Sequence, residues 1–197
     1  FPVYLIIGQT LFGFMSESTN QAIGSITGNA ALLKKTYVPK YVFTVSKVSS
    51  SFVNTLFALG ALVIVFVVCR VSVNIYYLFI PLILVQEYVF CLGLGMLLAQ
   101  SSVFFRDIQY IYNAIITAWT YLTPIFYPIT LLPDQLRYMV ETFNPMYFYI
   151  TQFRQIVLEG RMPEPYLIEA GCIVAIGVLV IGTWAFLKTQ DKFILYI

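Results

Sequence analysis

Side chains that could carry out covalent chemistry are sparse in this sequence. Its 197 residues include 11 Lys and Arg, 9 Asp and Glu, and no His. Without His, neither a Ser–His nor a Cys–His nucleophile pair can be assembled, and a metal site that uses His is excluded as well. The three cysteines, Cys69, Cys91 and Cys172, lie in or beside apolar runs at spacings that match no metal motif, so we predict small buried hydrophobes.

One acid, Glu87, lies well inside an apolar run, directly after Gln86. Burying an ionisable group in hydrocarbon is costly, so such a residue is a functional candidate by default. Two interpretations stay open for it. Glu87 is either a contact for a transported substrate or a structural carboxyl that is protonated or reaches water.

ATP hydrolysis is not encoded in this chain. The sequence has no G-x-x-x-x-G-K-[ST] motif, and its one Gly-x-Gly, Gly93-Leu94-Gly95, lies inside an apolar run. Close packing between membrane helices explains glycines in that setting better than phosphate binding does. We therefore expect no enzyme, and no cofactor bound by this chain.

Composition places the chain in a membrane. Hydrophobic residues make up 60% of it and charged residues 10%, against about 25% charged in soluble domains. The formal net charge of +2 is too small to indicate nucleic acid as a partner. Membrane lipid is the expected surrounding, and we predict a multi-pass membrane protein.

Five apolar runs are candidate spans. Backbone groups in lipid must be paired within their own element, so these runs predict helices and an all-α fold. The first run is shorter than the ~20 residues of a spanning helix, and nothing there resembles a signal peptide, so we expect the true start to be missing. The runs are Phe1–Met15, Val48–Cys69, Tyr77–Ala99, Ile108–Ile129 and Tyr166–Leu187.

Basic residues predict the orientation, because they collect in cytoplasmic loops. If residues 16–47 face the cytoplasm, seven basic residues lie inside and four outside, and the C-terminus is cytoplasmic. The inner seven are Lys34, Lys35, Lys40, Lys47, Arg106, Lys188 and Lys192; the outer four are Arg70, Arg137, Arg154 and Arg161.

The external segment after the fourth run is interrupted by prolines. Pro124 and Pro128 kink or end the span, which is tolerated where protein or a wet cavity takes up the freed carbonyls. Apolar residues at helical spacing then predict a short amphipathic helix up to Phe143, a break at Asn144-Pro145, and a second short helix that Gly160 terminates. The two helices suggest a hairpin that dips into the outer membrane face. Its expected aromatic lining is Tyr121, Phe126, Tyr127, Tyr147, Phe148 and Tyr149.

Two interpretations of this hairpin stay open from the residues alone. Tyr and Trp suit an aromatic belt at the headgroup level, which needs no function, and they suit a gate equally well.

The predicted cytoplasmic segment Asn20–Lys47 contains a short amphipathic helix with Lys34 and Lys35, which Pro39 ends. It is either held by anionic lipid, at about 1 kcal/mol per Lys, or it docks a soluble partner. Arg106 and Asp107 are adjacent and cannot pair side by side on a helix. We expect them to anchor a span at the inner surface, near the partner or this segment.

Four motifs in order resemble the permease subunits of type-2 ATP-binding-cassette (ABC) exporters. Among these, the chain is most similar to the group that exports lipid-linked polysaccharide, such as O-antigen, capsule and teichoic acid. The resemblance covers essentially the whole chain. The motifs are Asn29-Ala30-Ala31-Leu32-Leu33-Lys34-Lys35 with Tyr37-Val38-Pro39-Lys40, then Val103-Phe104-Phe105-Arg106-Asp107, then Leu122-Thr123-Pro124-Ile125-Phe126-Tyr127-Pro128, and Asn144-Pro145-Met146.

The resemblance implies one transmembrane permease domain over residues 1–197, with five visible spans of six. The family's N-terminal amphipathic helix and first span are then missing. It also implies pairing with a second copy and with two ABC ATPase subunits, which bind the ATP and magnesium. The location is a bacterial or archaeal cytoplasmic membrane. Val38, where the family often has Phe, and Ser102, where it often has Asn, are small departures.

The resemblance also assigns roles to residues. A coupling helix seated on the ATPase is expected from Asn29, Leu32, Leu33, Lys34, Lys35, Tyr37, Pro39 and Lys40, with Arg106 and Asp107 nearby. An outer gate or substrate path is expected from Trp119, Tyr121, Thr123, Pro124, Phe126, Tyr127, Pro128, Asn144 and Pro145.

Three alternatives remain at this point. In the first, the chain is such an exporter but its cargo is a drug or small lipid. In the second, the chain is an intramembrane enzyme that modifies lipid, although no cluster of catalytic groups converges at either interface. As a passive scaffold, the chain would have no reason for its proline-broken outer segment.

Overall fold

The computed structural model describes residues 2–35, 38–70 and 73–196, and these residues form helices and connections without a strand. This confirms the predicted all-α class. The α-helices are α1 Pro2–Ile23, α2 Ala30–Lys35, α3 Tyr41–Val68, α4 Ile80–Phe104, α5 Ile108–Leu122, α6 Asp134–Phe143, α7 Pro145–Val157, α8 Pro165–Thr189 and α9 Phe193–Tyr196. Short 3-10 helices cover Thr27–Asn29, Ile75–Phe79, Ile129–Leu131 and Gln190–Lys192.

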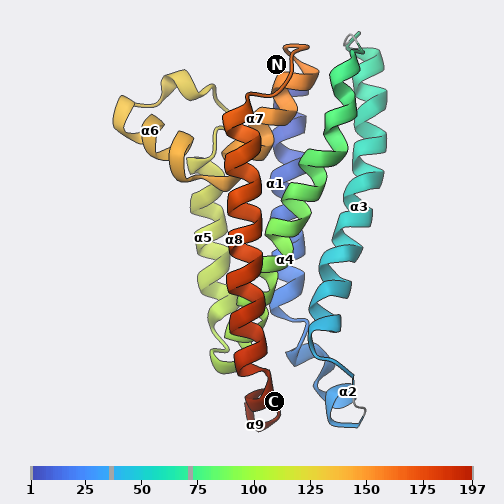
Figure 1. Ribbon diagram of the computed structural model, residues 1–197, viewed down its shortest axis with the longest axis vertical. Helices are drawn as coiled ribbons and strands as arrows, with labels where there is room; N and C mark the ends of the chain where they lie inside the picture. Colours follow the sequence, from blue (N-terminus) through green and yellow to red (C-terminus); the bar gives the residue numbers. More distant parts are fainter. Residues whose placement is uncertain (1, 36–37, 71–72, 197) are drawn as a thin grey trace.

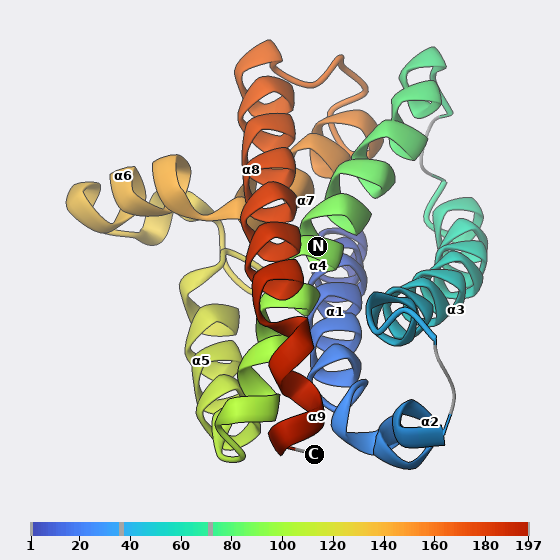
Figure 2. The ribbon, with the colours of Figure 1, turned by 60° about the horizontal axis from the view of Figure 1, so that its bottom comes forward.

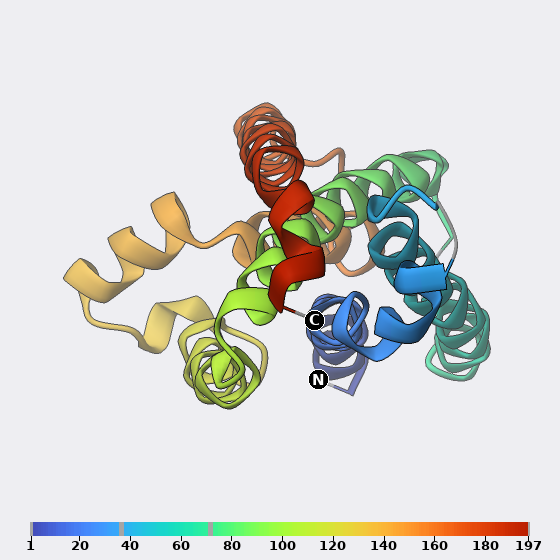
Figure 3. The same ribbon diagram turned by 90° about the horizontal axis from the view of Figure 1, so that it is seen from below.

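The long helices form an elongated bundle with different features at its two ends (Figure 1). α6, α7, the start of α1, the end of α3 and the 3-10 helix Ile75–Phe79 lie at one end, which we call the α6 end. α2, α9 and the connection from α4 to α5 lie at the other, the α2 end. α6 projects sideways from the bundle in every view (Figures 2 and 3).

Among the described residues, three helical segments are long and apolar enough to cross a membrane: Tyr41–Val68, Ile75–Phe104 and Pro165–Lys192. Large apolar side chains stay exposed on them, as expected of surfaces that face lipid; Phe57 on α3 is 76% exposed and Ile173 on α8 is 70% exposed. The other two predicted spans correspond to α1 and α5, which run beside these segments (Figure 1).

The limits of α1 and α5 differ from the predicted runs. α1 is 22 residues long and continues beyond Met15, and the polar side chains in this part are satisfied by carbonyls of the helix itself. Thr19 Oγ1 donates to Met15 O at 2.6 Å, and Asn20 Nδ2 donates to Ser16 O at 2.9 Å. α5, at 15 residues, stops at Leu122 instead of Ile129, just before Pro124.

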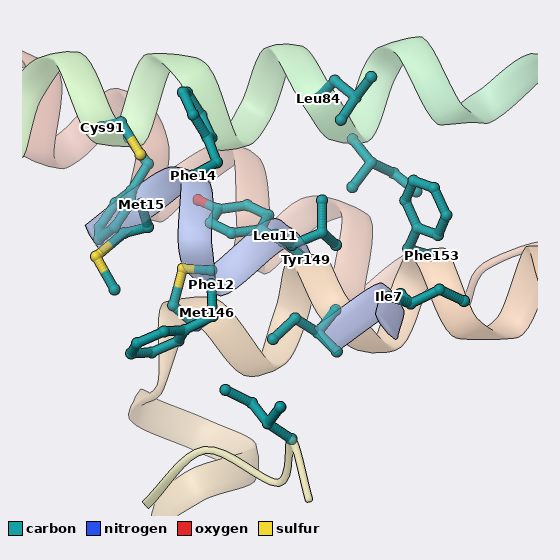
Figure 4. Close-up of a cluster of buried hydrophobic side chains, with 14 of the residues drawn as sticks. Ile7, Leu11, Phe12, Phe14, Met15, Leu84, Cys91, Met146, Tyr149 and Phe153 are labelled. Carbon is teal, nitrogen blue, oxygen red and sulfur yellow. The ribbon is translucent and has the colours of Figure 1, made fainter. Parts of the chain in front are cut away.

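α1 lies at the centre of the buried core. Its side chains Ile7, Leu11, Phe12, Phe14 and Met15 are buried against residues of α4 and α7 (Figure 4). The partners labelled there are Leu84 and Cys91 from α4, and Met146, Tyr149 and Phe153 from α7. α7 is therefore packed into the bundle together with the long helices.

Glycines bring α4 and α8 into backbone contact. A Cβ at Gly93 would lie 2.5 Å from the backbone of Val178 and Leu179, and a Cβ at Gly182 would lie 2.2 Å from Gly93 O. Any other residue at these positions would force the helices apart. This close approach confirms helix packing, and not phosphate binding, as the role of Gly93.

The cysteine prediction is confirmed in part. Cys91 is buried and Cys172 is half-buried, but Cys69 is exposed, so the prediction is wrong for Cys69. α3 ends at Val68, and Arg70 turns the chain with a φ of 52°, which places Cys69 at the end of the bundle and outside its core.

Candidate functional site

The end of α5 is held by an arginine that reaches across from α7. After Leu122 the backbone leaves the helix, and carbonyls after the break need new partners. The Arg154 guanidinium donates to Pro124 O at 2.7 Å and to Ile125 O at 3.2 Å. It also donates to Tyr4 O at 3.0 Å, and Arg154 is only 6% exposed. A buried cation thus satisfies the interrupted backbone.

Tyr4 of α1 closes the same break from the other side. Its hydroxyl lies within hydrogen-bond distance of two carbonyl acceptors, Pro124 O at 3.2 Å and Tyr127 O at 3.0 Å. Its ring lies 3.3 Å from the Arg154 guanidinium carbon, a cation–π contact. The prolines therefore interrupt α5 without leaving these carbonyls bare.

Asn144 joins this break to the start of α7. Its Oδ1 accepts from Met146 N at 3.1 Å, which caps α7, and from Trp119 Nε1 at 2.9 Å. Its Nδ2 donates to Thr123 Oγ1 at 2.9 Å. We call this cluster, consisting of Tyr4, Trp119, Thr123, Pro124, Asn144 and Arg154, the break junction. It connects α1, α5 and α7 through side-chain bonds.

The break junction contains four of the nine residues predicted for a gate or path: Trp119, Thr123, Pro124 and Asn144. A fifth, Pro145, is the first residue of α7, where its missing N–H costs nothing. The other four lie in or around the loop after the break. Tyr127 donates its hydroxyl to Tyr121 O at 2.7 Å; Tyr121 and Phe126 are exposed, and Pro128 starts the short turn at Ile129–Leu131. Their role in transport stays a prediction.

Two aromatic residues expected to line the hairpin belong to the core instead. Phe148 and Tyr149 are buried, and the Tyr149 hydroxyl donates to Gly171 O of α8 at 3.1 Å. Their face of α7 is turned toward α8, because that side of the amphipathic helix packs into the bundle.

The two short helices of the hairpin have different surroundings. α7 buries ten of its 13 residues, whereas Val140 is the one buried residue of α6. The apolar side of α6 faces α5 across an open groove of about 540 Å³, whose lining is almost entirely apolar. Trp119, Leu122, Leu136, Met139 and Phe143 contribute to this lining, so one face of Trp119 is open to the groove.

Glu87 lies apart from the break junction. Two amides beside it connect three helices: Gln152 Nε2 of α7 donates to Gln86 Oε1 of α4 at 3.3 Å and to Leu167 O of α8 at 2.9 Å. Glu87 is fully buried, and neither carboxyl oxygen has a hydrogen-bond partner among the described residues. Because the carboxyl is fully buried and has no hydrogen-bond partner among these residues, the interpretation as a structural carboxyl fits its surroundings better than a substrate contact.

At the α2 end, the predicted amphipathic helix is α2. Leu33 is buried and packs in a cluster with Phe186 and Phe193, while Leu32, Lys34 and Lys35 are exposed. This matches a helix with one face packed on the bundle and the other exposed.

The residues around α2 hold it against the last part of the chain. Lys40 Nζ donates to Gln190 O and lies 5.6 Å from the centroid of the Phe193 ring. Asn29 Nδ2 donates to Ser25 O at 2.8 Å, before α2 begins, and Pro39 is exposed. Tyr37, also predicted here, lies outside the described residues. Arg106 and Asp107 are exposed in the connection from α4 to α5, at this same end.

Tyr4 and Arg154 were missed as site residues by reasoning from the sequence. For Arg154 a signal existed: it follows Met146 and Ile150 at intervals of four residues, so it continues the apolar face of α7. A charge on that face requires partners in the interior. Tyr4 gives no comparable signal, because a tyrosine near a helix start is ordinary.

Comparison with known proteins identifies the family. The sequence model of the ABC-2 type transporter family matches residues 2–158 of this chain. The chain is also similar to the O-antigen export system permease protein RfbA of Myxococcus xanthus, with 25% identity over 194 residues, 98% of this chain and 75% of that protein. An RfbA of Klebsiella pneumoniae is 25% identical over 98% of this chain and 74% of its own length. The chain therefore belongs to the ABC-2 type transporter family, as a membrane subunit that is not itself an enzyme and that works with an ABC ATPase.

Proposed function

We propose that this chain is the membrane subunit of an exporter that moves lipid-linked polysaccharide out of the cytoplasm, with the break junction as part of its outer gate. The geometric observation that carries the gate is the set of bonds from Arg154 to the interrupted end of α5. The cargo is supported by the relatives in Myxococcus xanthus and Klebsiella pneumoniae, which are named for O-antigen export and align over nearly the whole chain.

The break junction suits a gate because it consists of a small number of specific bonds. α5 is short and buries only two of its residues, Tyr112 and Ile116. Its outer end is tied to α1 and α7 at the break junction, and nearer its start the Tyr112 hydroxyl donates to Thr19 Oγ1 of α1 at 2.8 Å. Exchanging the bonds made by Arg154 and Asn144 would release the outer end of α5 and the loop after it, while the start of α5 stays bonded to α1 and α7 stays packed in the core. A long chain then passes after a change in a few contacts, without unfolding of the bundle.

The proposed orientation places the α2 end in the cytoplasm. The exposed residues Lys34 and Lys35 of α2 then face the ATPase, and Arg106 and Asp107 lie at the same surface. Leu33 connects α2 to the bundle and Lys40 connects the start of α3 to the segment after α8, so a rigid-body movement of the ATPase is passed on to the long helices. Two ATPases and a second copy of this chain complete the proposed transporter.

A second copy has an available surface. α5 exposes Ile111, Ile115 and Leu122, and the apolar groove between α5 and α6 continues this surface. Apolar exposure of this kind suits lipid as well as a protein partner, so the dimer rests mainly on what the family resemblance implies. Cross-linking between two copies that each carry a single cysteine introduced into α5 would test whether α5 forms the dimer contact.

The coupling assignment is tested by replacing both Lys34 and Lys35 with Glu. The expected result is weaker association with the ATPase in co-purification. A matched control replaces Lys188 and Lys192 with Glu, because these two lysines are exposed at the same end and give the same change in charge. Equal loss in both variants would indicate a general charge effect, and unchanged association in the first variant would contradict the assignment.

The cargo is tested by depleting this subunit in its native cell and measuring polyprenyl-linked glycan on the cytoplasmic side of the membrane. Accumulation that the intact gene relieves supports polysaccharide export. Normal glycan at the cell surface without accumulation would instead favour a drug or small lipid as cargo. Membership of the ABC-2 family disfavours the lipid-modifying enzyme.

A further inference from the structure

A second open space at the α6 end lies on the other side of α6 from the apolar groove. It is a cleft of about 560 Å³ between α6, α7, the loop after the break and the start of α8. This volume lies in the ordinary range of small-molecule sites, roughly 300–1,000 Å³. We call it the polar cleft. It borders the break junction through Tyr4, Pro124 and Arg154, and the chain's other site predictions do not use its outer walls.

The walls of the polar cleft carry paired charges. Arg137 Nε on α6 donates to Glu141 Oε1 at 2.8 Å, and this hydrogen bond raises the pKa of Arg137. Arg161 Nη1 donates to Glu164 Oε1 at 3.2 Å. In total, three cations and three anions line the cleft: Arg137, Arg154 and Arg161 with Glu141, Glu159 and Glu164. Their formal charges cancel, so the cleft offers many hydrogen-bonding groups without a net charge that would select phosphate.

Two tyrosine rings face the same space. Tyr147 is half-buried and Tyr166 is 55% exposed, and both line the cleft. The buried Phe148 packs edge-on to both rings, with centroid distances of 6.4 Å in each case. Phe148 therefore packs against both tyrosine rings, and both rings border the cleft. Flat aromatic surfaces beside hydrogen-bonding groups suit the C–H faces and hydroxyl groups of sugars.

The loop wall of the cleft is held in place before any ligand arrives. Gln155 Nε2 donates to Glu164 Oε1 at 3.3 Å, and Glu164 N donates to Gln155 Oε1 at 3.0 Å. Arg161 N donates to Gln155 O at 3.2 Å, and Gly160 makes the turn with a φ of 64°. A wall fixed in this way loses little conformational entropy on binding.

We propose that the polar cleft is a binding site for an uncharged, polyhydroxylated sugar segment of the exported chain as it leaves at the α6 end. The proposal rests on the proposed function and adds a preference within it. Neutral sugar repeats fit the cancelled charges and the two tyrosine rings, whereas a polyol phosphate chain would meet as many carboxylates as guanidiniums. The apolar groove on the far side of α6 has few polar atoms, so α6 separates a surface for sugar from one for hydrocarbon.

The test is saturation-transfer NMR on the purified transporter complex, with two kinds of probe. The first is a panel of neutral trisaccharides built from glucose, galactose, mannose or rhamnose, and the second is a glycerol phosphate trimer. We expect binding of at least one neutral trisaccharide and none of the phosphate trimer. Tyr166→Ala should weaken the sugar binding about 3- to 10-fold, the usual contribution of one aromatic contact.

Tyr138→Ala is the matched control. Tyr138 lies on α6 and is 66% exposed, but it does not line the polar cleft, so its loss should leave sugar binding unchanged. Equal weakening by both variants, tighter binding of the phosphate trimer, or no binding across the neutral panel would each overturn the proposal.

The outcomes separate this inference from the proposed function. If depletion of the subunit traps glycan inside the cell but no neutral sugar binds, the exporter stands and the polar cleft is not its sugar site. If sugar binds and Tyr166→Ala weakens it, while depletion leaves surface glycan unchanged, the cleft stands and the export assignment falls.

Discussion

Replacing Arg154 with methionine tests the break junction directly. The variant keeps a long side chain but removes every donor. In the described part of the chain Arg154 is the partner of Ile125 O, and an unpaired buried carbonyl costs about 1–3 kcal/mol. Pro124 O keeps the Tyr4 hydroxyl at 3.2 Å but loses a bond to a charged group, normally worth about 1.5–3 kcal/mol.

Removing the cation also has a favourable effect that offsets part of this loss. A buried guanidinium has given up its hydration, and a methionine in its place has no such cost. We therefore expect the net free energy of unfolding to fall by about 2–4 kcal/mol, which corresponds to a decrease in Tm of about 4–16 °C for a chain of this length.

The assay is thermal unfolding of the purified permease in detergent, with two further variants. Arg154→Lys keeps a cation but not the fork of nitrogens, so its Tm should lie between those of the parent and Arg154→Met. Arg137→Met breaks the exposed pair with Glu141 on α6, and its Tm should stay close to that of the parent. If Arg154→Met and Arg137→Met had the same Tm, the break junction would not stabilise the fold as we describe.

Three further variants probe other parts of the structure. Gly93→Ala should abolish monodisperse protein in size-exclusion chromatography, because the methyl group would lie 2.5 Å from the α8 backbone; Gly60→Ala, which meets no atom within 4 Å, should elute normally. Asn144→Ala should cost about 1–3 kcal/mol in unfolding free energy and shift the Trp119 fluorescence, and an unshifted spectrum would contradict their hydrogen bond. Glu87→Gln should leave Tm and surface glycan unchanged, since no described residue bonds the carboxyl, and lost export by a stably folded variant would make Glu87 functional.

Local features of the fold were predictable because they follow from neighbouring residues. The break at Asn144-Pro145 separates α6 from α7, since a residue before proline leaves helical geometry. Apolar spacing predicted one short helix up to Phe143 and a second after the break, which are α6 and α7. Gly160 has a positive φ, but the prediction that it caps the second helix is wrong, because α7 ends at Val157 with Leu158 as its C-cap and Gly160 turns the loop two residues later.

The candidate site was only partly predictable, because its bonds connect residues far apart in the sequence. Trp119, Thr123, Pro124 and Asn144 belong to recognisable motifs, but the bond between Arg154 and Tyr4 spans 150 positions. Helical periodicity places a residue on a face without saying which helix that face meets. For the same reason, the sequence did not distinguish the buried helix α7 from the projecting helix α6.

The contact between Gly93 and Gly182 also bears on how a transport cycle is divided among the helices. With no side chain between them, α4 and α8 have no room to slide or roll against each other without a backbone collision. In the proposed transport cycle, α4 and α8 would therefore move as one rigid unit, and a movement passed from α2 to Phe186 of α8 would carry α4 with it.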